Sequence, residues 1–401
     1  MGLFRRKASD DGEKKEKGAW RRPANTAFKQ QRLKAWQPIL TPKTVLPTFF
    51  IVAIIFGPIG GLLIWGSSKV SEMRFDYTEC QNLQPSSNSS PQFSDLPTDK
   101  YSYRLSRTVD NIQRPQYAFV DNGNISGTDL SVSDQLQCVL RFQVPIDLEA
   151  PVFLYYGLTN FYQNHRRYVK SLDSDQLRGR GGDASSLDKG DCDPLGSING
   201  TAIYPCGLIA NSIFNDTFST PQLLNPSTSN PEALYVFSDK GIAWPGESKK
   251  YIDTPIGDGK GYKSFDEIVP PPNWALRFPP DGKYTQDHPP LNLAEDEHFQ
   301  NWMRTAGLPT FTKLYGRNDS TTMASGTYQI IIGMNFPVLP YKGTKSVVIS
   351  TVSWIGGKNP FLGWAYVAAA GLFAFLAIVG TIRHLAKPRR LGDMSLLSWN
   401  R

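Results

Sequence analysis

The residues of this chain that could do chemistry do not form a recognised catalytic motif. His298, in the segment EDEHFQ, has no second histidine four residues away, so the zinc-protease pattern is absent. The run 256–264, IGDGKGYKS, lacks the glycine spacing of a phosphate-binding loop, and the segment 238–241, SDKG, is not the D-K-T-G phosphorylation motif of P-type pumps. We therefore predict no catalytic residue and no cofactor. A carboxylate pair for glycoside hydrolysis stays open, because such pairs meet only in the fold.

The four cysteines, Cys80, Cys138, Cys192 and Cys206, favour disulfide bonds over a metal site. No C-x-x-C pair or Cys/His cluster with zinc-binding spacing occurs, so we predict no metal. Of the three possible pairings we expect the sequential one, which joins the first cysteine to the second and the third to the fourth. Each bond would stabilise the fold by roughly 3–4 kcal/mol. The carboxylates of 187–194, LDKGDCDP, could suggest calcium, but a solvated turn beside a disulfide is the simpler interpretation.

Glycosylation sequons share the same part of the chain. They begin at Asn88, Asn124, Asn199, Asn215 and Asn318. The N-x-S/T pattern marks acceptor sites on secreted surfaces, and disulfides persist in the same oxidising compartments. Together the two features place the middle of the chain in the secretory lumen or outside the cell.

Two apolar runs, 44–66 and 361–382, are long enough to cross a membrane and contain no Lys, Arg, Asp or Glu. A helix of about 20 residues spans the hydrocarbon core. Because 43 residues precede the first run, we read it as a signal anchor and not as a cleaved signal peptide. An ion path usually needs an ionisable group inside the membrane, so transport by this chain alone is not expected.

The charge distribution orients the two spans. Residues 1–43 hold 12 Lys/Arg and 4 Asp/Glu, and residues 383–401 hold 5 and 1, whereas residues 67–360 hold 26 and 31. Basic flanks stay in the cytosol, so we predict two cytosolic tails and a lumenal or extracellular domain over 67–360. The net charge of +7 then reflects topology and not a nucleic-acid surface.

The middle segment has the pattern of a β domain. Short apolar and aromatic runs alternate with Gly, Pro, Asn and Ser clusters, which predicts strands within 135–144, 150–158, 328–338 and 345–354. We expect one helix over 294–306 and loops over 174–201 and 219–233. The predicted fold class is two transmembrane α-helices with a mainly antiparallel, sandwich-like β ectodomain that carries long loops and a few short helices.

Two further features could contact a membrane or a partner. Residues 25–37 predict a short helix with Phe28 and Trp36 on it, although an ordinary basic flank explains the same composition. In the first span, Gly57 and Gly61 form a G-x-x-x-G spacing, which allows close helix packing. The partner of that face is either the second span or an outside helix.

Several long segments, in order along the chain, carry a family resemblance. They are 25–47, 74–80, 160–171, 205–216 and 301–316, the last reading NWMRTAGLPTFTKLYG. Together with the two spans they resemble the ligand-effect-modulator-three / cell-division-control-fifty family, the accessory (β) subunits of phospholipid flippases, which are type IV P-type ATPases. The layout of four cysteines is similar to the fungal branch.

The resemblance implies a 1:1 complex with a ten-span catalytic α subunit that moves phosphatidylserine or phosphatidylethanolamine to the cytosolic leaflet. It also implies a role in exit from the endoplasmic reticulum, with residence there, in the Golgi and endosomes, or at the plasma membrane. No catalytic residue carries over to this chain. We hypothesise that Arg166 and Arg167, with Phe161, Tyr162 and Tyr168, lie near the α subunit. The alternative places the aromatics in the core and the arginines in solvent.

Two other classes share this topology: an auxiliary subunit of a two-span channel-like complex, and a membrane-anchored lumenal glycan enzyme. The spans lack the polar residues of a channel, and the enzyme would turn over substrate as an isolated domain.

Overall fold

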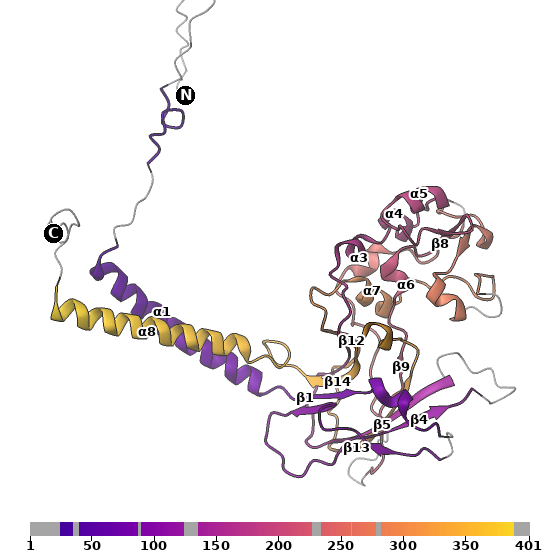
Figure 1. Cartoon of the computed structure of the whole chain (residues 1–401), viewed down its shortest axis with the longest axis horizontal. Coiled ribbons are helices and arrows are strands. Elements are labelled where there is room, and N and C mark those ends of the chain that lie inside the picture. The colour runs from indigo at the N-terminus through magenta and orange to yellow at the C-terminus, as the bar shows by residue number, and fades with distance from the viewer. Residues whose placement is uncertain are drawn as a thin grey trace, which may run out of the picture. The chain divides into compact units, whose positions relative to one another are not determined.

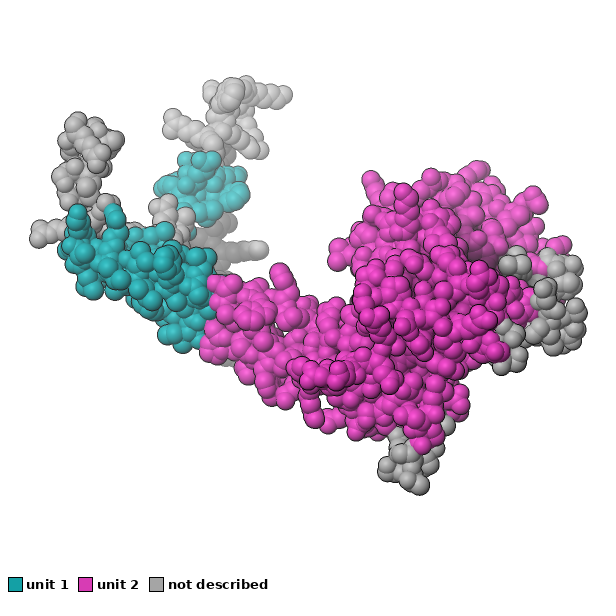
Figure 2. Space-filling view, turned by 60° about the horizontal axis from the view of Figure 1, so that its bottom comes forward, with its two compact units in different colours: residues 1–55, 369–401 teal, residues 56–368 magenta. Residues whose placement is uncertain are grey.

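The structure, a computed structural model, describes residues 25–34, 40–86, 90–123, 135–226, 234–257, 259–277 and 282–388. The predicted sites at Trp36, Asn88 and Asn124 lie outside these residues. The chain divides into two compact units, residues 1–55 with 369–401 and residues 56–368 (Figure 2). We call residues 69–360 of the second unit the β domain.

Two long apolar helices, α1 (Pro42–Ser68) and α8 (Phe361–Ala386), contain the predicted spans and are long enough to cross a membrane. They lie side by side (Figure 1). The rings of Phe56 and Tyr366 are 5.0 Å apart between centroids. Most of the apolar surface of each helix is exposed, as lipid contact requires.

Two antiparallel sheets form the base of the β domain. The first has the strand order β12-β6-β14-β1-β3 and the second the order β10-β13-β5-β4-β2, with β9 (Thr217–Phe218) beside β13. The bounds of the first sheet are β12 Phe311–Asn318, β6 Val152–Leu158, β14 Lys345–Thr351, β1 Glu72–Asp76 and β3 Tyr101–Arg104. Those of the second are β10 Gln222–Leu223, β13 Gly326–Gly333, β5 Leu136–Val144, β4 Gln116–Asp121 and β2 Ser94–Asp95.

The two sheets pack face to face around one core. Alternate residues of each strand point inward, and Phe75 of β1 contacts Phe142 of β5 at a centroid distance of 4.8 Å. The disulfide Cys80–Cys138 ties the short 3-10 helix η1 (Thr78–Asn82) to β5, and both cysteines are fully buried. The sandwich-like antiparallel fold predicted from the alternating runs is thus present.

A second core lies under short helices and loops inserted between the strands. It contains the buried rings of Trp274, Phe299 and Trp302. Around it stand α3 (Arg166–Lys170), α4 (Ser174–Leu177), α5 (Ala184–Lys189), α6 (Leu208–Asn211), α7 (Glu297–Met303), the 3-10 helices η2 (Glu247–Lys250), η3 (Phe265–Glu267), η4 (Pro272–Arg277) and η5 (Leu339–Tyr341), and the small sheet of β11 (Ile268–Val269), β8 (Thr201–Ile203) and β7 (Ser197–Ile198).

The loop predicted over 174–201 is wrong in part, because α4, α5 and β7 lie within it. The side chains of Asp173 and Asp183 cap α4 and α5 by accepting hydrogen bonds from the backbone N–H groups three residues later. Between β7 and β8, Asn199 and Gly200 both adopt positive φ, 50° and 82°, which makes a tight hairpin.

The helix predicted over 25–37 is also wrong in its described part, residues 25–34, where a single turn closes over 27–31. The backbone N–H of Lys29 donates to the Thr26 hydroxyl, so Thr26 does cap this turn. Gln31 then adopts a φ of 53°, which ends it. In contrast, the helix predicted over 294–306 is present as α7, with Asp296 as its cap.

A buried ion pair joins the two cores. The ammonium of Lys345 lies 2.8 Å from a carboxylate oxygen of Asp216, and the two side chains are 4% and 0% exposed. The same carboxylate accepts hydrogen bonds from the Tyr77 hydroxyl at 2.8 Å and from the backbone N–H groups of Asn335 and Phe336. Strand β14 of the sandwich is therefore fixed to the segments that carry the second core.

Candidate partner-binding surface

Three loops, 159–165, 304–310 and 338–344, are joined into one framework by hydrogen bonds. The backbone N–H of Phe161 donates to the Pro309 carbonyl at 3.1 Å, and the Asn164 amide donates to the Gly307 carbonyl at 3.0 Å. The Asn160 amide donates to the Tyr341 carbonyl. Loops tied in this way hold the side chains on their outer face in fixed positions.

That outer face combines exposed apolar and basic side chains. We call it the three-loop surface and define it as Tyr162, Leu308, Leu339 and Lys342 of these loops together with Arg166, the first residue of α3. Tyr162, Leu308 and Leu339 are 56%, 69% and 48% exposed, and the two basic residues are exposed as well. Aromatic and arginine side chains are enriched where proteins bind each other. The surface therefore has the composition of a protein interface.

The aromatics of 160–171 divide between core and surface. Phe161 points inward, and its ring lies within 5.6–6.0 Å of Tyr168, Trp302, Phe336 and Tyr341. The Tyr168 hydroxyl bonds to Ser212 at 2.8 Å, and burial raises the pKa of Tyr168 to about 12. Phe161 and Tyr168 thus belong to the core, as the alternative interpretation held, whereas Tyr162 is open to a partner.

The two arginines of α3 also differ. Arg167 lies 2.7 Å from a carboxylate oxygen of Asp193, and both side chains are more than half exposed. An exposed pair of this kind contributes at most about 1 kcal/mol, so a partner could exchange with it. Arg166 forms no salt bridge with any residue that the structure describes. Its guanidinium is the one more free to meet a carboxylate of a partner.

Lys313, which sequence reasoning did not single out, supports this surface from below. Its ammonium donates to the carbonyls of Asn301, Trp302 and Arg304 at 2.7, 3.4 and 2.5 Å, and so caps the end of α7. Burial, with a smaller effect from Arg304, lowers the pKa of Lys313 to about 7. Its position in a strand, two residues from Phe311 and two from Tyr315, gave no signal of this role.

A cleft of about 870 Å³ lies beside the loop 240–246. The Glu297 carboxylate accepts hydrogen bonds from the backbone N–H groups of Gly241, Ile242 and Ala243. Burial raises the pKa of Glu297, but these N–H groups outweigh it and leave that pKa lowered. Trp244 projects outward at 61% exposure with the Arg304 guanidinium 3.9 Å from its ring centroid. This rim extends the aromatic and basic character of the three-loop surface.

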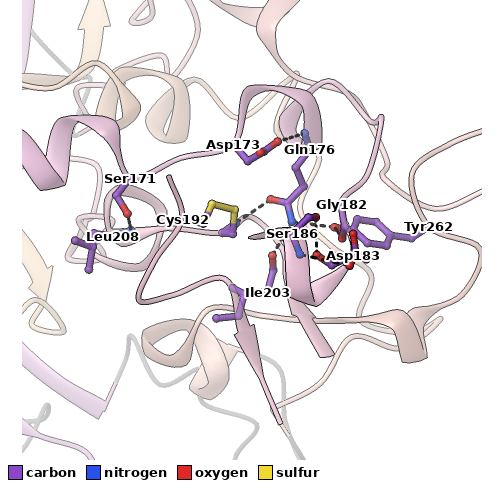
Figure 3. The surroundings of a disulfide bond; sticks show 11 residues. Ser171, Asp173, Gln176, Gly182, Asp183, Ser186, Cys192, Ile203, Leu208 and Tyr262 are labelled. Atoms are coloured by element: carbon purple, nitrogen blue, oxygen red, sulfur yellow. Dashed lines mark hydrogen bonds between the residues drawn. A yellow bond between two sulfur atoms is a disulfide. The ribbon is translucent and has the colours of Figure 1, made fainter. Parts of the chain in front are cut away.

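The second disulfide, Cys192–Cys206, lies beside Gln176 of α4 (Figure 3). The fully buried Gln176 accepts a hydrogen bond from the Cys206 N–H at 2.9 Å and donates to the Ile203 carbonyl at 2.7 Å and the Tyr262 hydroxyl at 2.9 Å. Both cysteine pairs match the sequential pairing that we expected.

The described sequons differ in access. Asn199 is exposed at the hairpin tip. Asn215 is half-buried, and its Oδ1 lies buried without a hydrogen-bond partner. The Asn318 amide nitrogen donates to the Val236 carbonyl at 2.9 Å and the Thr321 hydroxyl at 2.7 Å. Of these three, Asn199 presents its amide most freely.

On α1 the close helix contact uses a different glycine from the predicted pair. A Cβ built on Gly60 would lie 2.8 Å from a Val367 methyl carbon and 2.9 Å from the Gly363 carbonyl oxygen. A Cβ on Gly57 or Gly61 would meet nothing within 4 Å. The G-x-x-x-G face is therefore not the α1–α8 contact. Phe28, in the N-terminal turn, is 76% exposed.

The described residues offer no group of three or more His, Cys, Asp or Glu side chains placed to hold a metal ion. In the acidic segment 187–194, Asp188 accepts from the Ser197 hydroxyl and Asp193 pairs with Arg167. The ring of His298 is tilted by 42° against the ring of Tyr315, with the centroids 4.4 Å apart, and burial lowers the pKa of His298.

The structure combines two helices long enough to cross a membrane with a two-sheet domain that two disulfides stabilise. These features define a class of two-span membrane proteins whose folded domain presents surfaces to partners. Within that class, the chain belongs to the LEM3 (ligand-effect modulator 3) / CDC50 family, whose sequence model matches residues 63–390.

Curated relatives match over nearly the whole chain. It is 41% identical to the phospholipid-transporting ATPase accessory subunit CRF1 of Saccharomyces cerevisiae, over 94% of this chain and 89% of that protein. It is 40% identical to the accessory subunit CDC50 of Chaetomium thermophilum, over 98% and 94%. The match to cell cycle control protein 50A of Mus musculus is 39%, over 90% and 88%.

Proposed function

We propose that this chain is the non-catalytic accessory subunit of a phospholipid-transporting P-type ATPase. The observation that carries the proposal is the end-to-end match to relatives named as such subunits, with 94% and 98% of this chain covered. The geometry is consistent with this function, because the three-loop surface is exposed on a domain that two disulfides stabilise.

The proposed topology places both tails in the cytosol and the β domain on the lumenal or extracellular side. The basic composition of 1–43 and 383–401 supports it. Two disulfides in the β domain support an oxidising compartment. We propose glycans on the sequon asparagines, with Asn199 the best presented of the described ones.

The proposed partner is one large catalytic ATPase subunit per chain. Its exoplasmic loops would meet the three-loop surface, with Arg166 and the exchangeable Arg167 facing carboxylates and Tyr162 and Leu308 filling apolar pockets. The G-x-x-x-G face of α1, with Gly57 and Gly61, would meet a helix of that subunit. The complex would then leave the endoplasmic reticulum and move phosphatidylserine or phosphatidylethanolamine to the cytosolic leaflet.

The test is co-expression of the chain with a flippase ATPase, followed by measurement of complex yield and ATP-dependent phosphoenzyme. Arg166→Ala with Tyr162→Ala should reduce both, because these side chains have few contacts inside the chain. Arg178→Ala, which removes an exposed arginine of the same domain outside the three-loop surface, is the matched control. Unchanged yield and phosphoenzyme in the double variant would overturn the assigned surface. Failure of wild-type chain to raise either quantity would overturn the function.

A further inference from the structure

A polar cleft of about 570 Å³ opens in the β domain where the chain leaves α1. Its lining includes two cations, Lys69 and Arg107, and two anions, Asp147 and Glu149. Lys69 directly follows the last residue of α1, Ser68. A cleft of this volume lies within the range of small-molecule sites, about 300–1,000 Å³.

The charges of this cleft do not neutralise one another. Among the described residues, no salt bridge of 4.0 Å or less joins Lys69 or Arg107 to Asp147 or Glu149, or to any other carboxylate. Exposed opposite charges that line one small cleft would gain by pairing, yet no such pair forms here. We call the lining segments that carry Lys69 and Arg107 the basic walls and the segment that carries Asp147 and Glu149 the acidic wall. The cleft therefore offers a phosphate-binding and an ammonium-binding group at once.

The walls that hold the cations are braced. The backbone N–H of Ser71 donates to the Thr351 hydroxyl at 2.9 Å, and the Ser106 N–H donates to the Ser71 hydroxyl at 3.0 Å. The Lys358 ammonium donates to the carbonyls of Val70 and Leu105 at 2.7 and 3.2 Å. These bonds join the ends of β14, β1 and the segment after β3, so the backbone next to Lys69 and Arg107 is held in place before any ligand arrives.

The wall that holds the anions is braced as well. Leu148 and Met323 exchange two backbone hydrogen bonds of 2.9 Å. One oxygen of Asp147 accepts from the Ser325 N–H at 2.7 Å, which leaves the other oxygen available. Glu149 lies two residues further on and forms no salt bridge with a described residue. The acidic wall is thus as preorganised as the basic one.

Two tryptophans place the cleft at the membrane surface. Trp65, in the last turn of α1, is 56% exposed, and Trp354, after β14, is 68% exposed. The Lys69 ammonium lies 5.7 Å from the Trp65 ring centroid. Exposed tryptophans at the end of a membrane helix mark the headgroup layer. The cleft then opens at the depth where phospholipid headgroups lie.

We propose that this cleft binds the headgroup of a zwitterionic phospholipid from the adjoining leaflet. The phosphate is held by Arg107 and Lys69, and the ammonium by Glu149 and Asp147. A purely anionic lipid leaves the acidic wall unpaired, and a purely cationic one leaves the basic wall unpaired. The inference deepens the proposed function and rests on its membrane topology. It gives the accessory subunit a lipid contact of its own.

The test uses the purified full-length chain in detergent micelles, without the ATPase, and native mass spectrometry to titrate bound lipid. Phosphatidylethanolamine carries both charges, and phosphatidylglycerol carries the phosphate alone. Arg107→Ala should weaken binding of both lipids by about tenfold, the loss of one charge-assisted contact. Glu149→Ala should weaken phosphatidylethanolamine by a similar factor and leave phosphatidylglycerol unchanged.

The matched controls are Arg178→Ala and Asp99→Asn, which remove exposed charges of the same domain outside the cleft. If Arg107→Ala fails to fold, Lys69→Ala carries the same prediction. Equal retention of the two lipids by wild-type chain, or equal losses for both lipids in Glu149→Ala, would overturn the proposal. Binding of soluble phosphoethanolamine without binding of the lipid would overturn the leaflet as its source. Co-purification with the ATPase should be normal in these variants, so this outcome is separable from failure of the proposed function.

Discussion

The buried pair of Lys345 and Asp216 gives the sharpest prediction for the fold. Asp216→Asn keeps the size of the side chain and one acceptor oxygen but removes the negative charge. The Lys345 ammonium, 4% exposed, then keeps only the Phe336 carbonyl at 2.9 Å as a strong partner. Leaving one partner of a buried pair uncompensated destabilises a protein by about 3–5 kcal/mol. We expect that loss, or roughly 6–20 °C in the unfolding midpoint of the β domain.

The assay is denaturant unfolding of the full chain in micelles, followed by tryptophan fluorescence, because Trp274 and Trp302 are buried in the second core. Tyr77→Phe removes one hydrogen bond to the carboxylate and should cost about 1.5–3 kcal/mol. Asp216→Asn with Lys345→Met removes both charges, so it should be more stable than Asp216→Asn alone. A loss below about 1 kcal/mol for Asp216→Asn, or a double variant less stable than it, would refute the reasoning.

Three further predictions follow from other parts of the chain. Cys192→Ser opens a loop with a sequence separation of 14 and should cost about 3 kcal/mol, so glycan maturation of the complex should fail; normal maturation would contradict this. The folded pKa of Lys313 is about 7 against an ordinary 10.5, so the unfolded state binds more protons between these values, and the free energy of unfolding should rise with pH there by up to about 1.4 kcal/mol per unit. Denaturant unfolding at pH 7 and pH 9 should show that rise in wild type and not in Lys313→Met; equal slopes would refute the assignment. Gly60→Leu should push α1 away from α8 and lower cross-linking between cysteines placed at 56 and 366, whereas Gly61→Leu should leave the yield unchanged.

The spans and the sandwich strands were predictable because their signals are local. A run of more than 20 residues without charge, such as 361–382, is typical of a transmembrane helix. The apolar run 345–354 predicts a buried strand from its own residues alone. The short elements within 174–201 were missed because aspartate caps and a disulfide make them, not periodicity. The helix predicted over 25–37 did not form in the described residues 25–34, because all of these residues are exposed. A short isolated helix is only marginally stable in water.

The contacts that fix the fold and the candidate surfaces depend on residues far apart in the sequence. Asp216 and Lys345 come from different segments, and neither sequence neighbourhood predicts the other. The rotation of α1 about its axis decides that Gly60, and not Gly57 or Gly61, faces α8, and only the packed pair reveals it. Arg167 forms an ion pair and Arg166 does not, because Asp193, which is distant in sequence, lies next to Arg167. Sequence patterns could nominate Gly57, Gly61, Arg166 and Arg167, but they could not separate the roles of these residues.

The central claim is that this chain serves a phospholipid-transporting ATPase as its accessory subunit. The most direct measurement is purification of the tagged full-length chain in mild detergent, with mass spectrometry of the proteins that remain bound. The account predicts one large P-type ATPase per chain, in equal amounts. A chain that purifies alone, or only with copies of itself, under conditions that preserve other membrane complexes would contradict it.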